Sequence, residues 1–231
     1  MLFVWCKVSF DEKRSHGSAV CETVYFFVEF VCVFPWKCVS LNNQNRGKIM
    51  DGILRKLPIG IQTFEKLREG DYLYVDKTAL VWRIASTETP YFLSRPRRFG
   101  KSLLLSTFEA YFEGKKELFE GLVIANMEKE WKTYPVFHLD LNAEKYDSPQ
   151  ALVEILSRQL TQWELKYGKG EDEETLSGRF AGVIRRACEQ SGRGVVVLVD
   201  EYDKPLLQAL GDDALLDDYR KTLKAFYGVL K

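Results

Sequence analysis

The stretch GVVVLVD at residues 194–200 constrains the fold of this chain more than any other feature of its sequence. It places five consecutive apolar residues between Gly194 and Asp200. A continuous apolar run of this length is typical of a parallel strand that other elements cover on both faces. We therefore expect a central buried strand that ends at an acidic residue and has helices packed on both of its sides.

Helical and strand patterns alternate along the chain from Met50 onward. Apolar periodicity and boundary residues predict helices at residues 62–70, 76–87, 102–113, 149–167 and 174–190. Asp76 is the expected N-cap of the second of these helices. Shorter apolar stretches predict further strands at residues 71–75, 91–93 and 135–141. The alternation indicates an α/β domain with a doubly wound sheet.

The composition excludes some classes of protein. Among 231 residues, 33 are Lys or Arg and 33 are Asp or Glu, so the formal net charge is zero. A globally basic nucleic-acid-binding protein is therefore not indicated, although a local basic patch is compatible with this total. The five cysteines form no CxxC pair and no spacing typical of zinc, which favours reduced thiols in a cytoplasmic protein.

Residues 1–49 differ in composition from the rest of the chain. They hold four of the five cysteines and the apolar run VYFFVEFVCVF at residues 24–34. That run is too short to span a membrane and carries Glu29 in its middle, so we expect no membrane span. We interpret residues 1–49 as an unrelated or poorly ordered N-terminal extension, with Met50 as the expected true start. Residues 50–231 are then one domain.

The segment SRPRRFGKS at residues 94–102 lies between an expected strand and an expected helix. Gly100 lets the backbone approach a phosphate, Lys101 can reach the β- and γ-phosphate oxygens of a nucleotide, and the Ser102 hydroxyl can bind Mg²⁺. A standard phosphate-binding loop has its first glycine where this chain has Arg95. The segment therefore ends like a phosphate-binding loop but begins differently.

Arginines replace some of the backbone donors that this loop would otherwise offer. Arg95, Arg97, Arg98 and Lys101 place four cations within seven residues, and arginine binds phosphate bidentately. Three interpretations of the arginines stay open besides nucleotide binding. They are a solvated basic turn, ion pairs with acids such as Asp140 or Glu201, and contact with a nucleic-acid backbone while Phe99 stacks on a base.

Two adjacent carboxylates follow the apolar run in VVVLVDEYDK at residues 195–204. In phosphate-loop enzymes, an acid at the end of such a strand holds Mg²⁺, and the next acid can polarise the attacking water. Asp200 fits the first role and Glu201 fits the second. Together with the loop about a hundred residues earlier, this order of motifs predicts a site for phosphoryl chemistry.

Three motifs in this order resemble the AAA-ATPase-like domain family of mostly bacterial proteins. They are LPIGIQTFEKLREGDYLYVDKTALV (57–81), FLSRPRRFGKSLLLS (92–106) and VVVLVDEYDKPL (195–206). In that family, RPRRFGKS stands in for the usual Walker A string, and Asp200 with Glu201 forms the Walker B pair. The resemblance implies a P-loop NTPase-like three-layer domain with a mainly parallel sheet. The domain would be C-terminally incomplete, because the chain ends soon after Walker B.

The resemblance also implies ATP as ligand and Mg²⁺ as cofactor. The nucleotide-binding residues that it implies are Arg95, Arg97, Arg98, Phe99, Gly100, Lys101 and Ser102. The implied metal ligands are Ser102 and Asp200, and Glu201 is the implied catalytic residue. Residues 59–64 are an expected adenine pocket by analogy with related ATPases.

These inferences favour an ATPase and leave two alternatives open. One is a nucleotide-binding regulatory module without significant turnover, because segments that complete such ATPases are absent from this sequence. The other is a nucleic-acid-associated module that uses the arginine-rich loop, since family members often continue into a domain resembling PD-(D/E)XK nucleases. The sequence does not identify a protein or DNA partner, and it leaves an oligomer open.

Overall fold

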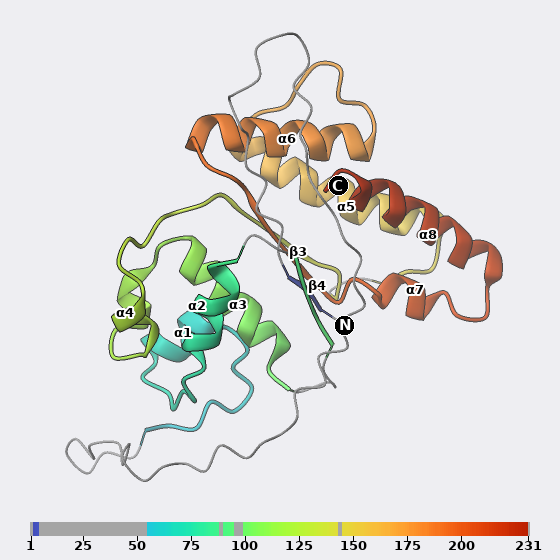
Figure 1. Ribbon diagram of the computed structural model, residues 1–231. Coiled ribbons are helices and arrows are strands. Elements are labelled where there is room, and N and C mark those ends of the chain that lie inside the picture. Colours follow the sequence, from blue (N-terminus) through green and yellow to red (C-terminus); the bar gives the residue numbers. More distant parts are fainter. Residues whose placement is uncertain (1, 5–54, 88–89, 95–98, 143–144, 231) are drawn as a thin grey trace.

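The computed structural model contains a small open sheet of four strands, with helices on both sides (Figure 1). The strands are β1 (Leu2–Val4), β2 (Tyr91–Leu93), β3 (Val136–Asp140) and β4 (Val196–Asp200). Their order across the sheet is β2-β1-β4-β3. The structure describes residues 2–4, 55–87, 90–94, 99–142 and 145–230.

Strand directions in the sheet are mixed. β3 and β4 are parallel, with Asp140 opposite Asp200 in the register. β1 runs antiparallel to both of its neighbours, β2 and β4, so β2, β3 and β4 share one direction. The α/β class expected from the sequence is confirmed. The insertion of β1 departs from a mainly parallel sheet, because two of the three pairings are antiparallel. Leu2–Val4 is the described part of residues 1–49, and the division of the chain near Met50 stays a prediction.

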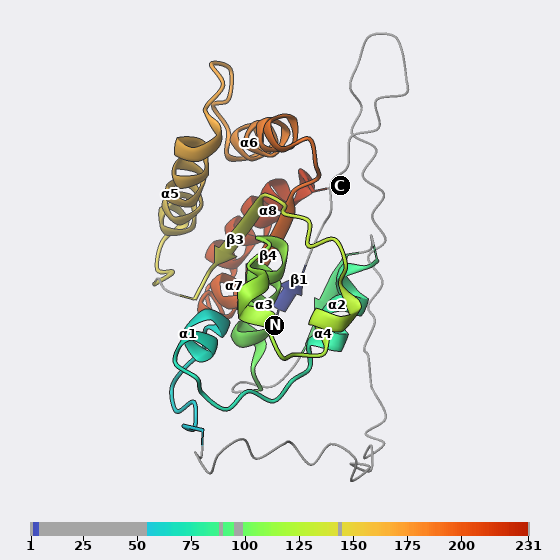
Figure 2. The same cartoon turned by 90° about the vertical axis from the view of Figure 1, so that its left-hand side faces the viewer.

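Helices cover both faces of the sheet, as the second view of the molecule shows (Figure 2). One layer contains α1 (Phe64–Glu69), α2 (Thr78–Ala85), α3 (Lys101–Phe112), the 3₁₀ helix η1 (Lys116–Phe119) and α4 (Ile124–Met127). The other contains α5 (Pro149–Tyr167), α6 (Leu176–Ser191), α7 (Lys204–Gln208) and α8 (Asp213–Gly228).

β4 separates two hydrophobic cores. Val196 and Leu198 belong to the core on the side of α3, whereas Val197 and Val199 belong to the core on the side of α5, α6 and α8. All five residues of β4 are buried. This alternation explains why the run at residues 195–199 is apolar without interruption, since each face of the strand meets a separate helical layer.

The core beside α5 and α6 is largely aromatic. The ring of Trp163 on α5 stacks on Phe137 of β3 at 4.7 Å between ring centroids and on Phe180 of α6 at 5.7 Å. Phe226 of α8 continues the stack at 4.5 Å from Phe180. These contacts hold three helices against one face of the sheet.

Two local expectations between α1 and α2 have different outcomes. The strand expected at residues 71–75 is wrong: Tyr72 makes one isolated bridge with Lys56, and Leu73 and Val75 are exposed, so no neighbouring strand stabilises an extended segment. The N-cap of α2 is Lys77 and not Asp76 as expected, but Asp76 lies one residue earlier and its Oδ1 accepts a hydrogen bond from the Thr78 backbone N–H at 2.8 Å. Its Oδ2 also accepts from the backbone N–H of Val123, which ties α2 to the start of α4.

Candidate functional site

The N-terminus of α3 lies at the edge of the sheet where the parallel strands end. Gly100 precedes the helix with a positive φ of 73°, and its carbonyl accepts a hydrogen bond from Leu104 at 3.0 Å. A Cβ at Gly100 would meet no atom within 4 Å, so the left-handed backbone conformation accounts for the glycine here. The first backbone N–H groups of α3 and the positive end of its dipole face this edge.

Ser102 and Asp200 meet across the site although they are 98 residues apart in the sequence. The Ser102 hydroxyl in the first turn of α3 donates a hydrogen bond to Asp200 Oδ2 at 2.7 Å. Asp200 is the last residue of β4. Packing of α3 against β4 therefore joins the two motifs that the sequence predicts to act together.

Lys101 and Glu201 form the second link between the same elements. Lys101 Nζ lies 3.4 Å from Glu201 Oε1, and the two side chains are 7% and 24% exposed. Glu201 follows β4 directly and has a positive φ of 52°, which is costly for a residue with a Cβ. The structure thus brings together Gly100, Lys101, Ser102, Asp200 and Glu201.

Asp200 is a buried carboxylate with an unusual electrostatic environment. Burial raises the pKa of Asp200, the Ser102 hydrogen bond opposes this shift, and the negative charges of Asp140 and Glu201 add to it. Among the described residues, the buried Asp200 Oδ1 has no hydrogen-bond partner. Buried polar atoms of this kind normally have a partner, and a carboxylate oxygen beside a hydroxyl suits a hard cation such as Mg²⁺.

The donor set is small for a metal held by protein alone. Within the described ranges, no group of three or more His, Cys, Asp or Glu side chains could hold a metal ion. Mg²⁺ commonly keeps several waters and binds through one or two protein oxygens together with substrate phosphates. The pair Ser102 and Asp200 fits this mode of binding. Two protein oxygens would not hold Mg²⁺ firmly without a bound phosphate.

A half-buried histidine on β3 was not identified from the sequence as part of this region. His138 lies on β3, and its Nδ1 is 3.0 Å from Glu109 Oε2 of α3. Burial alone would lower the pKa of His138, but the Glu109 hydrogen bond and the charges of Glu109, Asp140 and Asp200 raise it overall. Residues 109 and 138 carry no motif, and only the packing of α3 on β3 shows that they meet.

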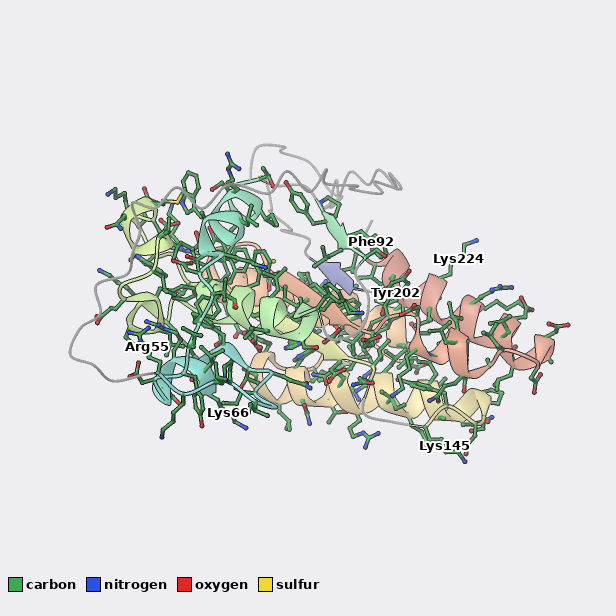
Figure 3. The ribbon with its side chains drawn as sticks, turned by 90° about the horizontal axis from the view of Figure 1, so that it is seen from below. Arg55, Lys66, Phe92, Lys145, Tyr202 and Lys224 are labelled. Carbon is green, nitrogen blue, oxygen red and sulfur yellow. The ribbon has the colours of Figure 1, made fainter. Side chains whose placement is uncertain are left out.

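Aromatic side chains occupy different positions around the site. Phe92 of β2 contacts Tyr202, which follows the acidic pair, edge to face at 5.9 Å between ring centroids (Figure 3). Phe99 is 61% exposed, so it is accessible to a ligand. Phe64, in the expected adenine pocket at residues 59–64, is instead buried in the core against Phe119 at 4.8 Å.

Part of the expected site falls outside the described residues. Arg95, Arg97 and Arg98 lie outside the described residues, so their predicted contacts with a nucleotide stay predictions. Lys101 was also part of the basic patch considered for nucleic-acid binding. Its side chain is buried and paired with Glu201, so it is not presented at the surface.

The fold and this site define an α/β protein in which Gly100, Lys101 and Ser102 at the start of α3 lie next to Asp200 and Glu201 at the end of β4. The sequence model of the AAA-ATPase-like family, described as "Predicted AAA-ATPase", matches residues 58–231, and the chain belongs to this family.

Comparison with curated proteins finds a relative that is similar in sequence. The chain is 42% identical over 178 residues to an "uncharacterized protein in vnfD 5′region" of Azotobacter chroococcum mcd 1. That match covers 77% of this chain and 34% of the relative, so this chain spans about a third of the relative's length. No solved structure matches the chain. In the part of the chain that the structure describes, every helix is too short or too polar to cross a membrane.

Proposed function

We propose that residues 50–231 form an ATP-binding domain that binds ATP together with Mg²⁺. The observation that carries this proposal is the 2.7 Å hydrogen bond between Ser102 and Asp200. It joins the end of the loop to the end of the buried strand, which is the arrangement that a phosphate-bound Mg²⁺ requires of its two protein partners. Membership of a family of predicted AAA-ATPases supports the same function.

Each residue of the site has a role in binding the triphosphate. The first backbone N–H groups of α3 and the helix dipole attract phosphate oxygens, and Gly100 keeps the approach free of a side chain. Lys101 supplies a positive charge within a largely buried environment, where its attraction to phosphate is weakly screened. Arg95, Arg97 and Arg98 would add bidentate contacts, and Phe99 is exposed beside them. Mg²⁺, when bound by Ser102 and Asp200, would neutralise charge on the phosphates.

Hydrolysis is the second part of the proposal. Glu201 would orient a water molecule and accept its proton as the water oxygen bonds to the γ-phosphorus. The bond from that phosphorus to the β–γ bridging oxygen breaks, and the products are ADP and inorganic phosphate. Because this reaction needs positioned charge more than covalent catalysis, Lys101, Glu201 and the helix N-terminus are sufficient parts for its core.

Calorimetric titration with Mg·ATP tests the binding function. The wild-type chain is expected to bind, and Lys101→Ala is expected to weaken binding at least about a hundredfold, since a charge-assisted contact in a buried site is lost. Lys115→Ala is the matched control, because Lys115 is a partly exposed lysine that pairs with Glu65 and Glu113 away from the site. Equal affinities for the wild type and Lys101→Ala would refute the proposal.

One observation favours a second function, a nucleotide-binding module with negligible turnover. Glu201 contacts Lys101, so its carboxylate is engaged within the protein. Comparing phosphate release by the wild type and by Glu201→Gln separates the two functions. A wild-type rate well above that of the variant supports an ATPase, and equal rates near zero support the binding module.

A further inference from the structure

The Lys101–Glu201 pair has the properties of a contact that a ligand can replace. The two atoms are 3.4 Å apart, whereas ammonium–carboxylate hydrogen bonds in stable pairs are about 2.7–2.9 Å. Glu201 is the acid that forms an ion pair with Lys101 among the described residues. An ammonium group offers three donors, so this single long contact leaves most of its binding capacity unused.

Burial explains why Lys101 needs an anion even when no ligand is bound. Only 7% of its side chain is exposed, and an unpaired ammonium in such an environment carries a large desolvation penalty. Glu201, directly after β4, supplies one negative charge. A nucleotide triphosphate supplies more charge and more acceptor oxygens at the same N-terminus of α3, and it can therefore outcompete one carboxylate.

The backbone holds Glu201 in the position from which it contacts Lys101. β4 ends at Asp200, and the turn that follows is closed by a hydrogen bond of 2.9 Å from the Lys204 backbone N–H to the Glu201 carbonyl. Glu201 adopts the left-handed conformation within this turn, although it is not a glycine. A strained residue that carries the paired carboxylate points to a functional reason for the strain.

We propose that the Glu201 carboxylate occupies the place of a phosphate oxygen on Lys101 before nucleotide binds, and that the phosphate displaces it. This inference rests on the proposed ATP-binding function and adds a regulatory step to it. Before nucleotide binds, Glu201 neutralises the charge of Lys101, and the affinity for ATP is reduced by the free energy of the pair that must be broken. Displacement breaks the contact between Lys101 and Glu201 at the moment when a γ-phosphate is present, so the position of the Glu201 carboxylate is coupled to substrate binding.

The test is Mg·ATP affinity in Glu201→Gln, which keeps the shape of the side chain and removes its charge. The variant is expected to bind Mg·ATP about tenfold more tightly than the wild type, corresponding to loss of a competing partly buried ion pair. Without ligand it is expected to unfold at a lower temperature, because Lys101 has lost its counter-charge. Glu65→Gln is the control, since it removes one carboxylate from the exposed pair with Lys115 and should leave the affinity unchanged.

A second variant keeps the test valid if Glu201→Gln folds poorly. Glu201→Asp retains the charge but shortens the side chain by one methylene, so its carboxylate should reach Lys101 less well and ATP should again bind more tightly. Wild-type affinity in both variants, or weaker binding in both, would overturn the inference while leaving ATP binding itself intact. Absence of binding in the wild type and in both variants would instead refute the proposed function.

Discussion

Two buried ion pairs in this molecule are built in different ways. Arg179 of α6 contacts both carboxylate oxygens of Glu164 on α5 at 2.7 and 2.8 Å. The same guanidinium donates to the hydroxyls of Ser157 at 2.6 Å and Thr161 at 2.9 Å. Lys101 has one contact with Glu201, at 3.4 Å.

The difference separates a structural pair from one suited to binding. The Arg179 network satisfies its donors and acceptors inside the protein, so it fixes α6 on α5 and has little capacity left for a ligand. At the sheet edge, by contrast, Lys101 has spare donors and Asp200 Oδ1 has no partner among the described residues. The Lys101 pair therefore differs from the Arg179 pair in its unused hydrogen-bonding capacity.

The largest effect is expected from breaking the structural pair. Arg179→Leu should lower the free energy of unfolding by about 3–5 kcal/mol, because Glu164 would keep a buried charge without its partner. Urea-induced unfolding measures this change. Arg185→Leu is the control on the same helix: Arg185 is 57% exposed and lies 3.8 Å from Glu173, so its loss should cost less than about 1 kcal/mol. Similar costs for both variants would contradict the distinction.

Removing a hydroxyl from the binding side should affect affinity more than stability. Ser102→Ala is expected to weaken Mg·ATP binding at least about tenfold, since a partner of Asp200 and of the cation is lost. Ser106→Ala, one turn later in α3, removes the acceptor of the Phe64 backbone N–H at 2.8 Å. That variant should lose about 1 kcal/mol of stability and keep its affinity for Mg·ATP. Calorimetry measures the affinity and thermal unfolding measures the stability of both variants. Unchanged affinity in Ser102→Ala, or weakened affinity in Ser106→Ala, would contradict this expectation.

The backbone strain at Glu201 can be separated from its carboxylate. Both Glu201→Ala and Glu201→Gly remove the ion pair, but only glycine relieves the positive φ of 52°. Glu201→Gly is therefore expected to be more stable than Glu201→Ala by about 1 kcal/mol. Chemical denaturation of the two proteins checks this difference, and an alanine variant as stable as the glycine variant would show that the turn carries no strain.

The smallest expected effect is a pH dependence of stability from His138 and Glu109. The pKa of His138 is raised above 6.5, so its stabilising contribution is complete below that value and is lost as pH rises through the raised pKa. Burial alone would raise the pKa of Glu109, but the hydrogen bond and the charge of His138 lower it below 4.5 overall. The stabilising contribution of Glu109 is therefore lost as pH falls through this lowered pKa.

The pair should consequently stabilise the protein most between the two ordinary values. The stability advantage of the wild type over Glu109→Gln is expected to be larger near about pH 5.5 than near about pH 8.5. Urea unfolding at both pH values measures it. An advantage that does not shrink at the higher pH would mean that His138 is not protonated in the folded chain.

The buried strand and the joined motifs could be predicted from the sequence because local patterns encode them. Five apolar residues before Asp200 require cover on both faces, and β4 has it. A glycine before Lys101 and Ser102 predicts a helix start, and α3 begins at Lys101. Since strand ends and helix starts share one edge in such folds, the approach of Ser102 to Asp200 followed from topology.

Other features depend on contacts between distant segments that carry no local signal. Nothing in the first residues of the chain predicts that Leu2–Val4 would lie between β2 and β4. The pairing of His138 with Glu109 and the direct contact of Lys101 with Glu201 arise only when α3 packs on the sheet. Residues 71–75 show the reverse case, in which a β-like pattern pairs with Lys56 only through one isolated bridge at Tyr72.

The most direct test of the account is a structure of the chain bound to Mg²⁺ and an ATP analogue with a non-hydrolysable β–γ bridge. The distance from Lys101 Nζ to its nearest acceptor decides the result. The account predicts that this acceptor is a phosphate oxygen, and that the Glu201 carboxylate has moved beyond ion-pair distance. An analogue bound elsewhere, with Lys101 and Glu201 still 3.4 Å apart, would contradict it.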